Sequence, residues 1–365
     1  MSEMLAVRAH ADSTELHVTK IPVPEVGPQD VLVRVAAAGL APGMMTLLAR
    51  GAFRHLPTTL GHEAAGTVVA VGDQVTGVAE GTRVRVHPNL TCRSCEYCRT
   101  DREMMCAQQA MMGHAAFSPV PMPLYAEYHD GGLAEYVRVP HWLVDPLPDN
   151  VSFDVGAKVH DLANAVRALK LADLTPGATL VVTAATGTMG TATVKLAPHF
   201  GVGRLVLVGR SAERLADVAR ISPLPVETVA CESLPDGWEK TAGLTRRLRE
   251  IVPGGAHAVL DFAPAGRMTA QSMAAMRTGG TIVHMGASQE PLDLPAAVMM
   301  VNCWRFVGTR ACTRTDAREV LALLDSGALR VDDLITHRFP LTDARAAVAA
   351  MQSRTEPIWM AVVNP

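Results

Sequence analysis

The sequence predicts an α/β protein in which a barrel-like β unit is followed by a doubly wound parallel sheet. Up to about residue 155, short β-rich runs such as VLVRVAAAG from Val31 and TRVRVHP from Thr82 are separated by Gly and Pro. Beyond about residue 160, apolar strands such as TLVVTAAT from Thr179 and RLVLVGR from Arg204 alternate with helix-length segments. Because alternating strands and helices are typical of parallel pairing, this second part predicts a sheet covered by helices.

Length and charge exclude several classes of protein. The 365 residues fit two domains, since a domain usually holds about 150 residues. The net charge is −3, from 33 Lys and Arg against 36 Asp and Glu, so there is no basic surplus to bind nucleic acid or an anionic membrane. The N-terminal segment has no signal-peptide pattern, and no apolar run is long enough to span a membrane. These features predict a cytoplasmic protein with neither nucleic acid nor a membrane as partner.

Four of the seven cysteines lie close together with the spacing C-x2-C-x2-C-x7-C. This spacing lets one loop close its thiolates around a tetrahedral ion, and zinc is the metal that such a set favours. Because sulfur would fill every position, the ion would stabilise the loop without taking part in a reaction. Clustered thiols also fit a reducing compartment better than a disulfide framework does. The sequence therefore predicts a structural zinc loop at about residues 90–108 with the ligands Cys92, Cys95, Cys98 and Cys106.

A glycine-containing turn follows the strand that begins at Thr179 and precedes a helix. Backbone N–H groups in the first turn of such a helix can bind a pyrophosphate, so the turn predicts a dinucleotide site. The pattern is A-x-x-G-x-x-G, in which Ala184 stands where the fingerprint usually has its first glycine. The candidate cofactor-binding residues of the turn are Ala184, Thr186, Gly187, Thr188, Met189 and Gly190.

The choice of cofactor is expected at the end of the next strand. An acidic residue there would bind the ribose hydroxyls of NAD, but this sequence has Gly209, Arg210 and Ser211. Without a carboxylate to repel a 2′-phosphate, Arg210 and Ser211 favour NADP(H) over NAD(H), and Arg214 can assist them.

Several segments together carry a family resemblance. They are LGHEAAGTVVAVGDQVTGVAEGTRVRV, the four-cysteine loop, GGLAEYVRVP and the strand, turn and helix around Ala184. Over nearly its whole length, the chain resembles the zinc-containing alcohol dehydrogenase branch of the medium-chain dehydrogenase/reductase family. The resemblance implies a GroES-like catalytic domain formed by residues 1–160 and 305–365 and a Rossmann cofactor domain at residues 161–304. It also implies a homodimer or homotetramer and hydride transfer in a cleft between the domains.

The residues that would hold a catalytic zinc depart from the family pattern. In that family two cysteines and the His of the GHE motif bind the ion. Here Ala41 takes the place of the first cysteine and His160 that of the second, and Gly43 replaces the hydroxyl residue that relays the alcohol proton. The candidate catalytic residues are therefore His62, Glu63, His160 and Asp161.

Different chemistries follow from these departures. The favoured interpretation is an NADP(H)-dependent reductase without a catalytic zinc, which reduces an activated C=C or C=N bond in a hydrophobic small molecule. The alternative is a zinc-dependent alcohol dehydrogenase or carbonyl reductase in which His62, Glu63 and His160 or Asp161 rebuild the metal site. A further alternative is a catalytically silent dinucleotide-binding protein. Methionines such as Met44 suggest a roomy apolar substrate pocket.

Overall fold

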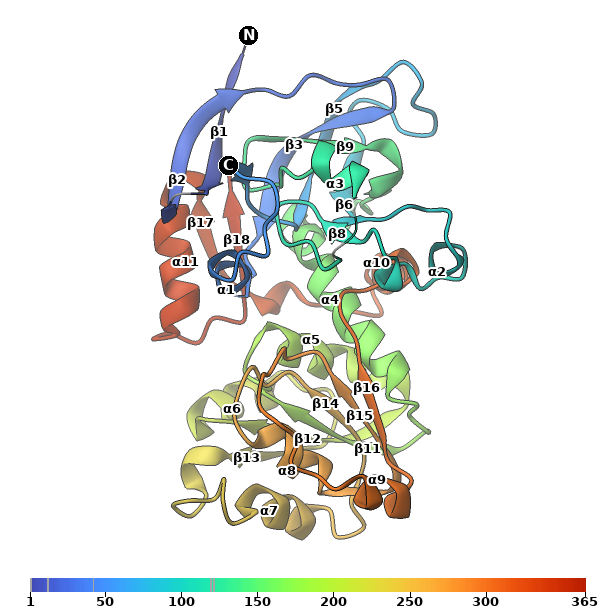
Figure 1. The fold of residues 1–365 in the computed structure, drawn as a ribbon, viewed down its shortest axis with the longest axis vertical. Coiled ribbons are helices and arrows are strands. Elements are labelled where there is room, and N and C mark those ends of the chain that lie inside the picture. The colour runs from blue at the N-terminus through green and yellow to red at the C-terminus, as the bar shows by residue number, and fades with distance from the viewer. Residues whose placement is uncertain (1, 12, 42, 119, 121) are drawn as a thin grey trace. The chain divides into compact units, whose positions relative to one another are not determined.

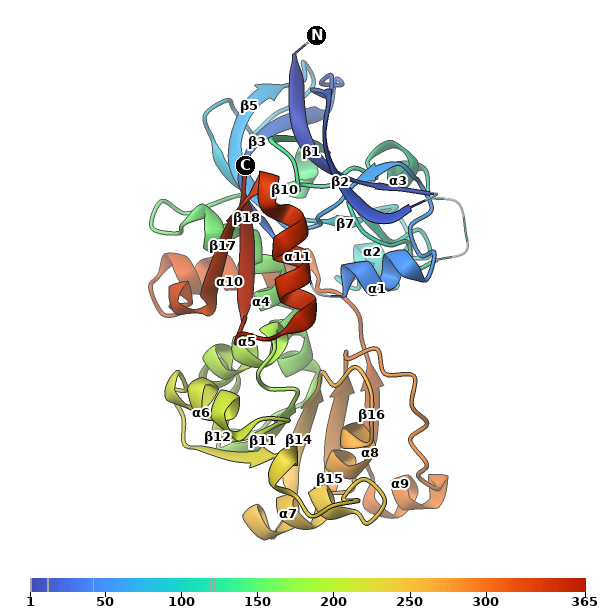
Figure 2. The same ribbon diagram turned by 90° about the vertical axis from the view of Figure 1, so that its left-hand side faces the viewer.

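The computed structural model describes residues 2–11, 13–41, 43–118, 120 and 122–365. The chain divides into two compact units (Figures 1 and 2), of which the first comprises Met1–His160 with Cys312–Pro365 and the second comprises Asp161–Ala311. The second unit ends at residue 311 and not at residue 304, because strand β16 (Arg305–Gly308) pairs with the parallel sheet of that unit. Among the described residues, no helix is long and apolar enough to cross a membrane.

The first unit is built on mainly antiparallel sheets. A seven-stranded sheet has the order β10-β6-β5-β3-β18-β17, with β9 also pairing with β3, and a three-stranded sheet has the order β2-β1-β4. The strands β7 (Asn89–Leu90) and β8 (Ala110–Met111) form a separate pair. The other strands are β1 (Glu3–His10), β2 (Ser13–Pro22), β3 (Asp30–Gly39), β4 (Thr58–Thr59), β5 (Ala64–Val71), β6 (Arg83–Val86), β9 (Tyr136–Pro140), β10 (Val144–Pro146), β17 (Ile335–Pro340) and β18 (Met360–Asn364).

An apolar core holds the strands of the first unit together. Val33, Val68 and Val84 are buried on β3, β5 and β6 and belong to one cluster, which Val348 of a C-terminal helix joins. β-Branched side chains suit such packed strands because their stiff rotamers lose little freedom on burial. The helices of this unit are α1 (Met44–Ala49), α2 (Glu96–Arg99), α3 (Pro123–Glu127), α10 (Arg314–Asp325) and α11 (Ala344–Ser353), and α4 (Phe153–Leu171) runs across the boundary between the units.

The second unit is a six-stranded parallel sheet with the order β13-β12-β11-β14-β15-β16. Every residue of the central strand β11 is buried, as expected for a sheet covered by helices. The doubly wound sheet that the sequence predicts is thereby confirmed. Its strands are β11 (Ala178–Thr183), β12 (Val202–Gly209), β13 (Val226–Ala230), β14 (Ala256–Asp261), β15 (Met276–His284) and β16, and its helices are α5 (Thr188–Leu196), α6 (Ala212–Arg220), α7 (Gly243–Ile251), α8 (Met268–Met273) and α9 (Ala296–Asn302).

Helix α10 begins with a capping box. The Thr313 side chain accepts a hydrogen bond from the backbone N–H of Asp316, and the Asp316 side chain accepts one from the backbone N–H of Thr313. These two bonds satisfy donors that the helix itself leaves unpaired.

Thr313→Ala is expected to lower the free energy of unfolding of the first unit by about 1 kcal/mol, because it removes the cap acceptor. Urea denaturation followed by circular dichroism measures the change. The matched control is Thr342→Ala, at an exposed threonine outside any helix cap. Equal stability of the two variants would contradict the capping argument.

Candidate functional site

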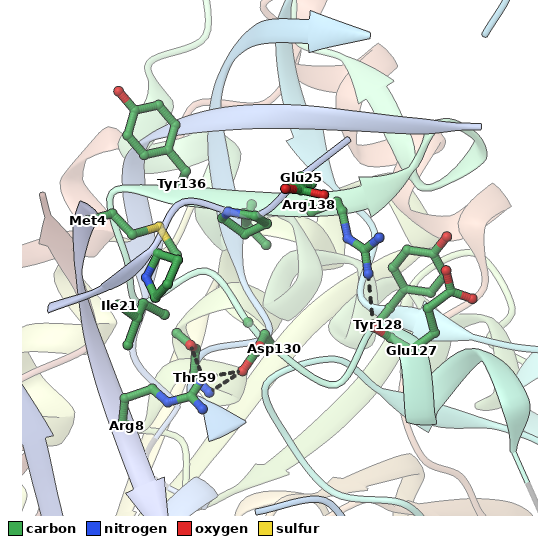
Figure 3. A pocket seen from close by; sticks show the side chains of 14 residues that line it. Met4, Arg8, Ile21, Glu25, Thr59, Glu127, Tyr128, Asp130, Tyr136 and Arg138 are labelled. Atoms are coloured by element: carbon green, nitrogen blue, oxygen red, sulfur yellow. Dashed lines mark hydrogen bonds and ion pairs between the residues drawn. The ribbon is translucent and has the colours of Figure 1, made fainter. Parts of the chain in front are cut away.

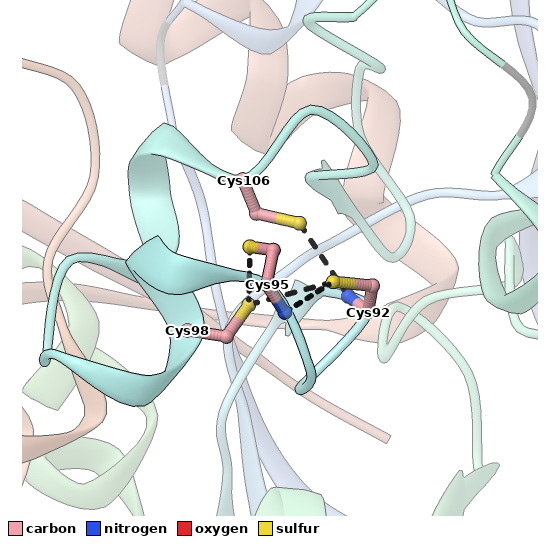
Figure 4. Close-up of side chains that lie close together, drawn as sticks. All are labelled: Cys92, Cys95, Cys98 and Cys106. Atoms are coloured by element: carbon pink, nitrogen blue, oxygen red, sulfur yellow. Dashed lines mark hydrogen bonds between the residues drawn. The ribbon is translucent and has the colours of Figure 1, made fainter.

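The four predicted zinc ligands lie together in the loop after β7 (Figure 4). Their sulfur atoms all lie within 4.8 Å of one another, and Cys106 is the buried member of the set. The backbone N–H of Cys95 donates to the sulfur of Cys92 at 3.3 Å, and that of Cys92 donates to the sulfur of Cys106 at 3.5 Å. Such N–H···S bonds favour thiolates. The sulfur set therefore fits a tetrahedral zinc ion with no position left open for a substrate.

Three histidines lie together in the first unit, and a contact between glycines places two of them. The N–H of Gly61 donates to the carbonyl of Gly113 at 3.0 Å, and a Cβ on Gly113 would lie 2.5 Å from the Gly61 oxygen. Only glycine allows this approach. It brings His62 and His114, the next residue in each segment, together with their ring centroids 4.5 Å apart. Helix α4 contributes His160, whose centroid is 5.1 Å from that of His62.

Sequence reasoning found two of these histidines and missed the third. His62 belongs to the GHE motif and His160 stands at the position of a family cysteine, whereas His114 lies in MMGHAAF and belongs to no recognised motif. One sequence feature points to His114: like His62, it follows a glycine in an apolar stretch.

Burial favours the neutral form of His62 and His114 in this histidine cluster. The relative exposures of His62, His114 and His160 are 6%, 7% and 2%. Burial lowers the pKa of His62 well below its usual value, and the nearby His114, His160 and Lys158 lower it further. Burial lowers the pKa of His114 to about 4. The Nδ1 atoms of His62 and His114 have no hydrogen-bond partner in the described part of the chain. Neutral imidazoles with unused nitrogens are the form in which histidine binds a divalent metal.

Glu63 has a different position from the one expected of a metal ligand. Its Oε2 accepts a hydrogen bond from Nζ of Lys158 at 2.5 Å, and both side chains are buried. Lys158 also donates to the carbonyl of Leu40 at 3.4 Å. The carboxylate lies against the chain at Gly39, where a Cβ would be 2.1 Å from it. The structure thus pairs Glu63 with an ammonium group, and Lys158 is a residue that sequence reasoning missed.

His160 and Asp161 do not act as one pair. Nδ1 of His160 lies 3.5 Å from the sulfur of the buried Cys312, whose carbonyl accepts a hydrogen bond from the Asn89 amide at 2.8 Å. Asp161 is buried and is the first residue of the second unit. Consecutive residues of a helix point in directions about 100° apart, so Asp161 does not share the direction of His160. The histidine is the one that belongs to the cluster.

The predicted cofactor turn lies between β11 and α5. Ala184 has φ of 48°, a left-handed conformation that glycine would adopt without strain. At Gly190 a Cβ would lie 2.4 Å from the carbonyl oxygen of Ala185, so no larger residue fits. Gly187 is the N-cap of α5, and no side chain caps that helix. The first-turn N–H groups are thus positioned to bind a pyrophosphate, and the turn is formed by Ala184, Thr186, Gly187, Thr188, Met189 and Gly190.

The end of β12 carries both basic and acidic groups. Arg210 follows Gly209 and is exposed, and the Ser211 side chain caps α6 by accepting from the N–H of Arg214 at 3.5 Å. The carboxylate of Glu232 accepts a hydrogen bond from the N–H of Ala212 at 2.7 Å. The expectation that no carboxylate lies here is therefore wrong, because the next strand brings Glu232 to the start of α6. Glu232 is distant in sequence from Arg210, so the residues at the end of β12 do not by themselves reveal it.

The first unit has a cavity of about 500 Å³ (Figure 3), and none of the predicted site residues lines it. Arg8 points into it and donates to Asp130 and Thr59, and Arg138 donates to the buried Asp30. The guanidinium groups of Arg8 and Arg138 are thus already paired with acidic or hydroxyl groups of the protein. These bonds stabilise the fold around β1 and β4.

Comparison with known families follows the same division of the chain. Residues 27–149 match the alcohol dehydrogenase GroES-like domain, and residues 188–326 match the zinc-binding dehydrogenase domain. The chain belongs to the zinc-containing alcohol dehydrogenase-like branch of the medium-chain dehydrogenase/reductase family, and it is an NAD(P)-dependent oxidoreductase. The resemblance and the GroES-like and Rossmann folds that it implied are confirmed.

Individual relatives are similar over most of their length. Sorbitol dehydrogenase of Bombyx mori is 26% identical over 357 residues, covering 97% of each chain. L-idonate 5-dehydrogenase of Vitis vinifera is 28% identical over 327 residues, covering 87% of this chain and 82% of the relative. A structure from Sinorhizobium meliloti, described as a zinc-binding dehydrogenase bound to NADP, has a TM-score of 0.85 at 26% identity and covers 100% of both chains. All three are named as dehydrogenases.

Cys95→Ser is expected to remove one zinc ion per chain and to lower the melting temperature by several degrees, because it breaks the sulfur set. Elemental analysis and differential scanning fluorimetry measure both effects. Cys303→Ser is the control, since Cys303 is exposed and lies outside the set. A Cys95→Ser protein that keeps the wild-type zinc content would contradict the assignment.

Proposed function

We propose that the chain is an NADP(H)-dependent enzyme that interconverts an alcohol and a carbonyl compound, with a divalent metal bound by His62, His114 and His160. The observation that carries the proposal is the cluster of three buried imidazoles, two of which have an unpartnered nitrogen. Three protein ligands leave one position for water or substrate, which is the arrangement of catalytic zinc sites.

The donor set fits zinc in its chemistry. Imidazole nitrogen is a common zinc ligand, and the lowered pKa values of His62 and His114 favour the neutral form that coordination requires. Among the described residues, the four cysteines are the group whose donor atoms all lie within 4.8 Å of one another. The three imidazoles would therefore have to turn about their side-chain bonds to bind one ion. In this proposal His114 takes the place of Glu63 as the third metal ligand, because the Glu63 carboxylate is paired with Lys158.

Each part of the proposed mechanism has its own residues. A bound zinc would supply a Lewis acid that polarises the carbonyl oxygen. His62, His114 and His160 would hold the ion, and the Gly187 turn would hold the dinucleotide at its pyrophosphate. Gly43 has no side chain to carry a proton, and a Cβ there would meet nothing within 4 Å. The substrate's hydroxyl proton would then be exchanged with water rather than passed along a side-chain relay.

Aromatic rings next to the cluster favour a substrate with an apolar part. The ring centroids of Phe53 and Phe117 lie 5.9 Å and 6.2 Å from that of His114. Phe53 is buried in the core, whereas Phe117 is half-buried and offers apolar surface, which stabilises a hydrophobic small molecule better than a polyol. We infer that the substrate is a hydrophobic alcohol or its carbonyl counterpart.

The cofactor, the assembly and the compartment are parts of the same proposal. Arg210 and Arg214 favour the 2′-phosphate of NADP(H) by charge, while Glu232 opposes it. A homodimer or homotetramer is what the family implies. A cytoplasmic location is proposed because the four thiolates need a reducing compartment to remain available for zinc.

The zinc-free reductase remains a second candidate because of one observation. Lys158 places a buried ammonium close enough to His62 to lower its pKa. A positive charge at this place disfavours a second cation. In that case the histidine cluster would take part in proton transfer to an activated C=C or C=N bond instead of binding metal.

The zinc content of variants separates the two candidates. Wild-type protein is expected to contain two zinc ions per chain, and His114→Ala is expected to contain one while keeping the wild-type melting temperature within a few degrees. Elemental analysis after dialysis provides the numbers, and His199→Ala, at an exposed histidine, is the control. One ion in the wild-type protein would reject the metal centre and favour the zinc-free reductase.

Cofactor preference is tested at the end of β12. Arg210→Ala is expected to raise the Kd of NADPH by about tenfold with little change for NADH, because it removes a charge-assisted contact to the 2′-phosphate. Glu232→Gln is expected to lower the Kd of NADPH, because it removes a repelling charge. Fluorescence titration with both cofactors measures these values. An unchanged NADPH affinity in Arg210→Ala would refute the preference for NADP(H).

A further inference from the structure

A row of polar residues crosses the carboxyl end of the parallel sheet in the second unit. Thr183 ends β11, Asp261 ends β14 and His284 ends β15. The three residues are neighbours in register, since Thr183 pairs with Asp261 and Asp261 pairs with His284. Figure 1 labels these strands in the lower part of the view. A carboxylate inside a buried sheet is costly unless it is fully hydrogen-bonded, so its presence here points to a function.

Asp261 is fully buried, and its hydrogen bonds define where the protons lie. Its Oδ1 accepts a hydrogen bond from the Thr183 hydroxyl, which itself accepts from the N–H of Phe262 at 3.1 Å. Its Oδ2 accepts from the Thr269 hydroxyl of α8 at 2.8 Å and from Nδ1 of His284 at 2.6 Å. Because the carboxylate acts as acceptor in each bond, Nδ1 of His284 carries the proton.

The other nitrogen of His284 is left available. With a proton on Nδ1, Nε2 of a neutral imidazole has a lone pair and accepts hydrogen bonds. No residue in the described part of the chain bonds to this Nε2, and the side chain is 18% exposed. The ring is stacked on Phe306 with the centroids 6.0 Å apart and the planes at 27°. Asp261 and Phe306 thus fix the direction of an unused acceptor.

The strand order of the parallel sheet indicates that Nε2 of His284 lies near the nicotinamide half of the dinucleotide site. In a doubly wound sheet, ligands bind outside the carboxyl ends of the strands where the strand order reverses, and here the reversal falls between β11 and β14. The Gly187 turn follows β11, and Arg210 at the end of β12 is on the side of the adenosine half. His284 ends β15, on the opposite side of the reversal, which is the side of the nicotinamide half.

We propose that His284, held by Asp261, contacts the bound dinucleotide and accepts a hydrogen bond from a ribose hydroxyl or carboxamide N–H of its nicotinamide half. The inference rests on the proposed function in one respect, that the chain binds a nicotinamide dinucleotide. It adds a cofactor contact that lies outside the glycine turn and the end of β12. The contact selects the position of the nicotinamide ring, because it fixes the nucleoside that carries the ring.

The test compares the whole cofactor with its adenosine half, using the full chain. Fluorescence and calorimetric titrations measure the Kd of NADPH and of 2′,5′-ADP, or of NADH and 5′-AMP if the wild-type protein binds NADH more tightly. His284→Phe keeps a ring against Phe306 but removes the acceptor. It is expected to weaken the whole dinucleotide by about fivefold to tenfold, the effect of one lost hydrogen bond, and to leave the fragment unchanged.

Two further variants complete the experiment. His284→Gln keeps an acceptor oxygen and is expected to recover part of the lost affinity. His257→Ala is the matched control, since His257 lies at the amino end of β14, the end opposite Asp261. Melting temperatures confirm that each variant is folded, and His284→Leu, which also lacks an acceptor, carries the comparison if His284→Phe unfolds.

The outcomes separate this inference from the proposed function. If His284→Phe binds the whole dinucleotide as well as the wild-type protein does, or weakens the fragment equally, the inference is overturned while cofactor binding stands. If the wild-type protein binds neither dinucleotide, the proposed function fails.

Discussion

The positions of His62 and His114 in the first unit depend on a close backbone contact among Gly61, Gly113 and Gly131. A Cβ on Gly131 would lie 2.1 Å from the Gly61 oxygen, and one on Gly113 would lie 2.6 Å from the Cα of Gly131. Side chains at these positions would push the three segments apart by the width of a methyl group. The neighbouring His62 and His114 would then separate, so the histidine pair is created by backbone packing and not by bonds between the rings.

Charge at this site is arranged differently from the family pattern implied by the sequence. Two thiolates are replaced by neutral groups, and the Glu63 carboxylate is balanced by Lys158 within the protein. A buried carboxylate without its partner would cost several kcal/mol, which accounts for the close pairing of these two residues. A dication bound by neutral imidazoles keeps more of its charge than one bound by thiolates, so it polarises a carbonyl more strongly. In the proposed site, neutral imidazoles would also hold the ion less tightly than thiolates do.

The sequence predicted what depends on local order and missed what depends on distant contacts. The alternation of strands and helices predicted the parallel sheet, and the cysteine spacing predicted the sulfur cluster, because in both cases the interacting residues are close in sequence. His114, Lys158 and Glu232 were missed because folding brings each of them to its partner from a distant segment. No periodicity or spacing encodes such a contact.

The departures from the family pattern were visible in the sequence, but their consequence was not. Ala41 and His160 indicated that the metal site had changed, and the zinc-free interpretation followed from the loss of both cysteines. The structure adds a third imidazole, and the proposed metal site depends on it.

Anomalous X-ray diffraction at the zinc edge, on crystals of the protein grown with zinc, tests the central claim most directly. The account predicts two anomalous peaks in each chain, one among the four cysteine sulfurs and one within bonding distance of His62, His114 and His160. A single peak at the cysteine loop, with the three imidazoles bonded only to protein or water, would contradict it.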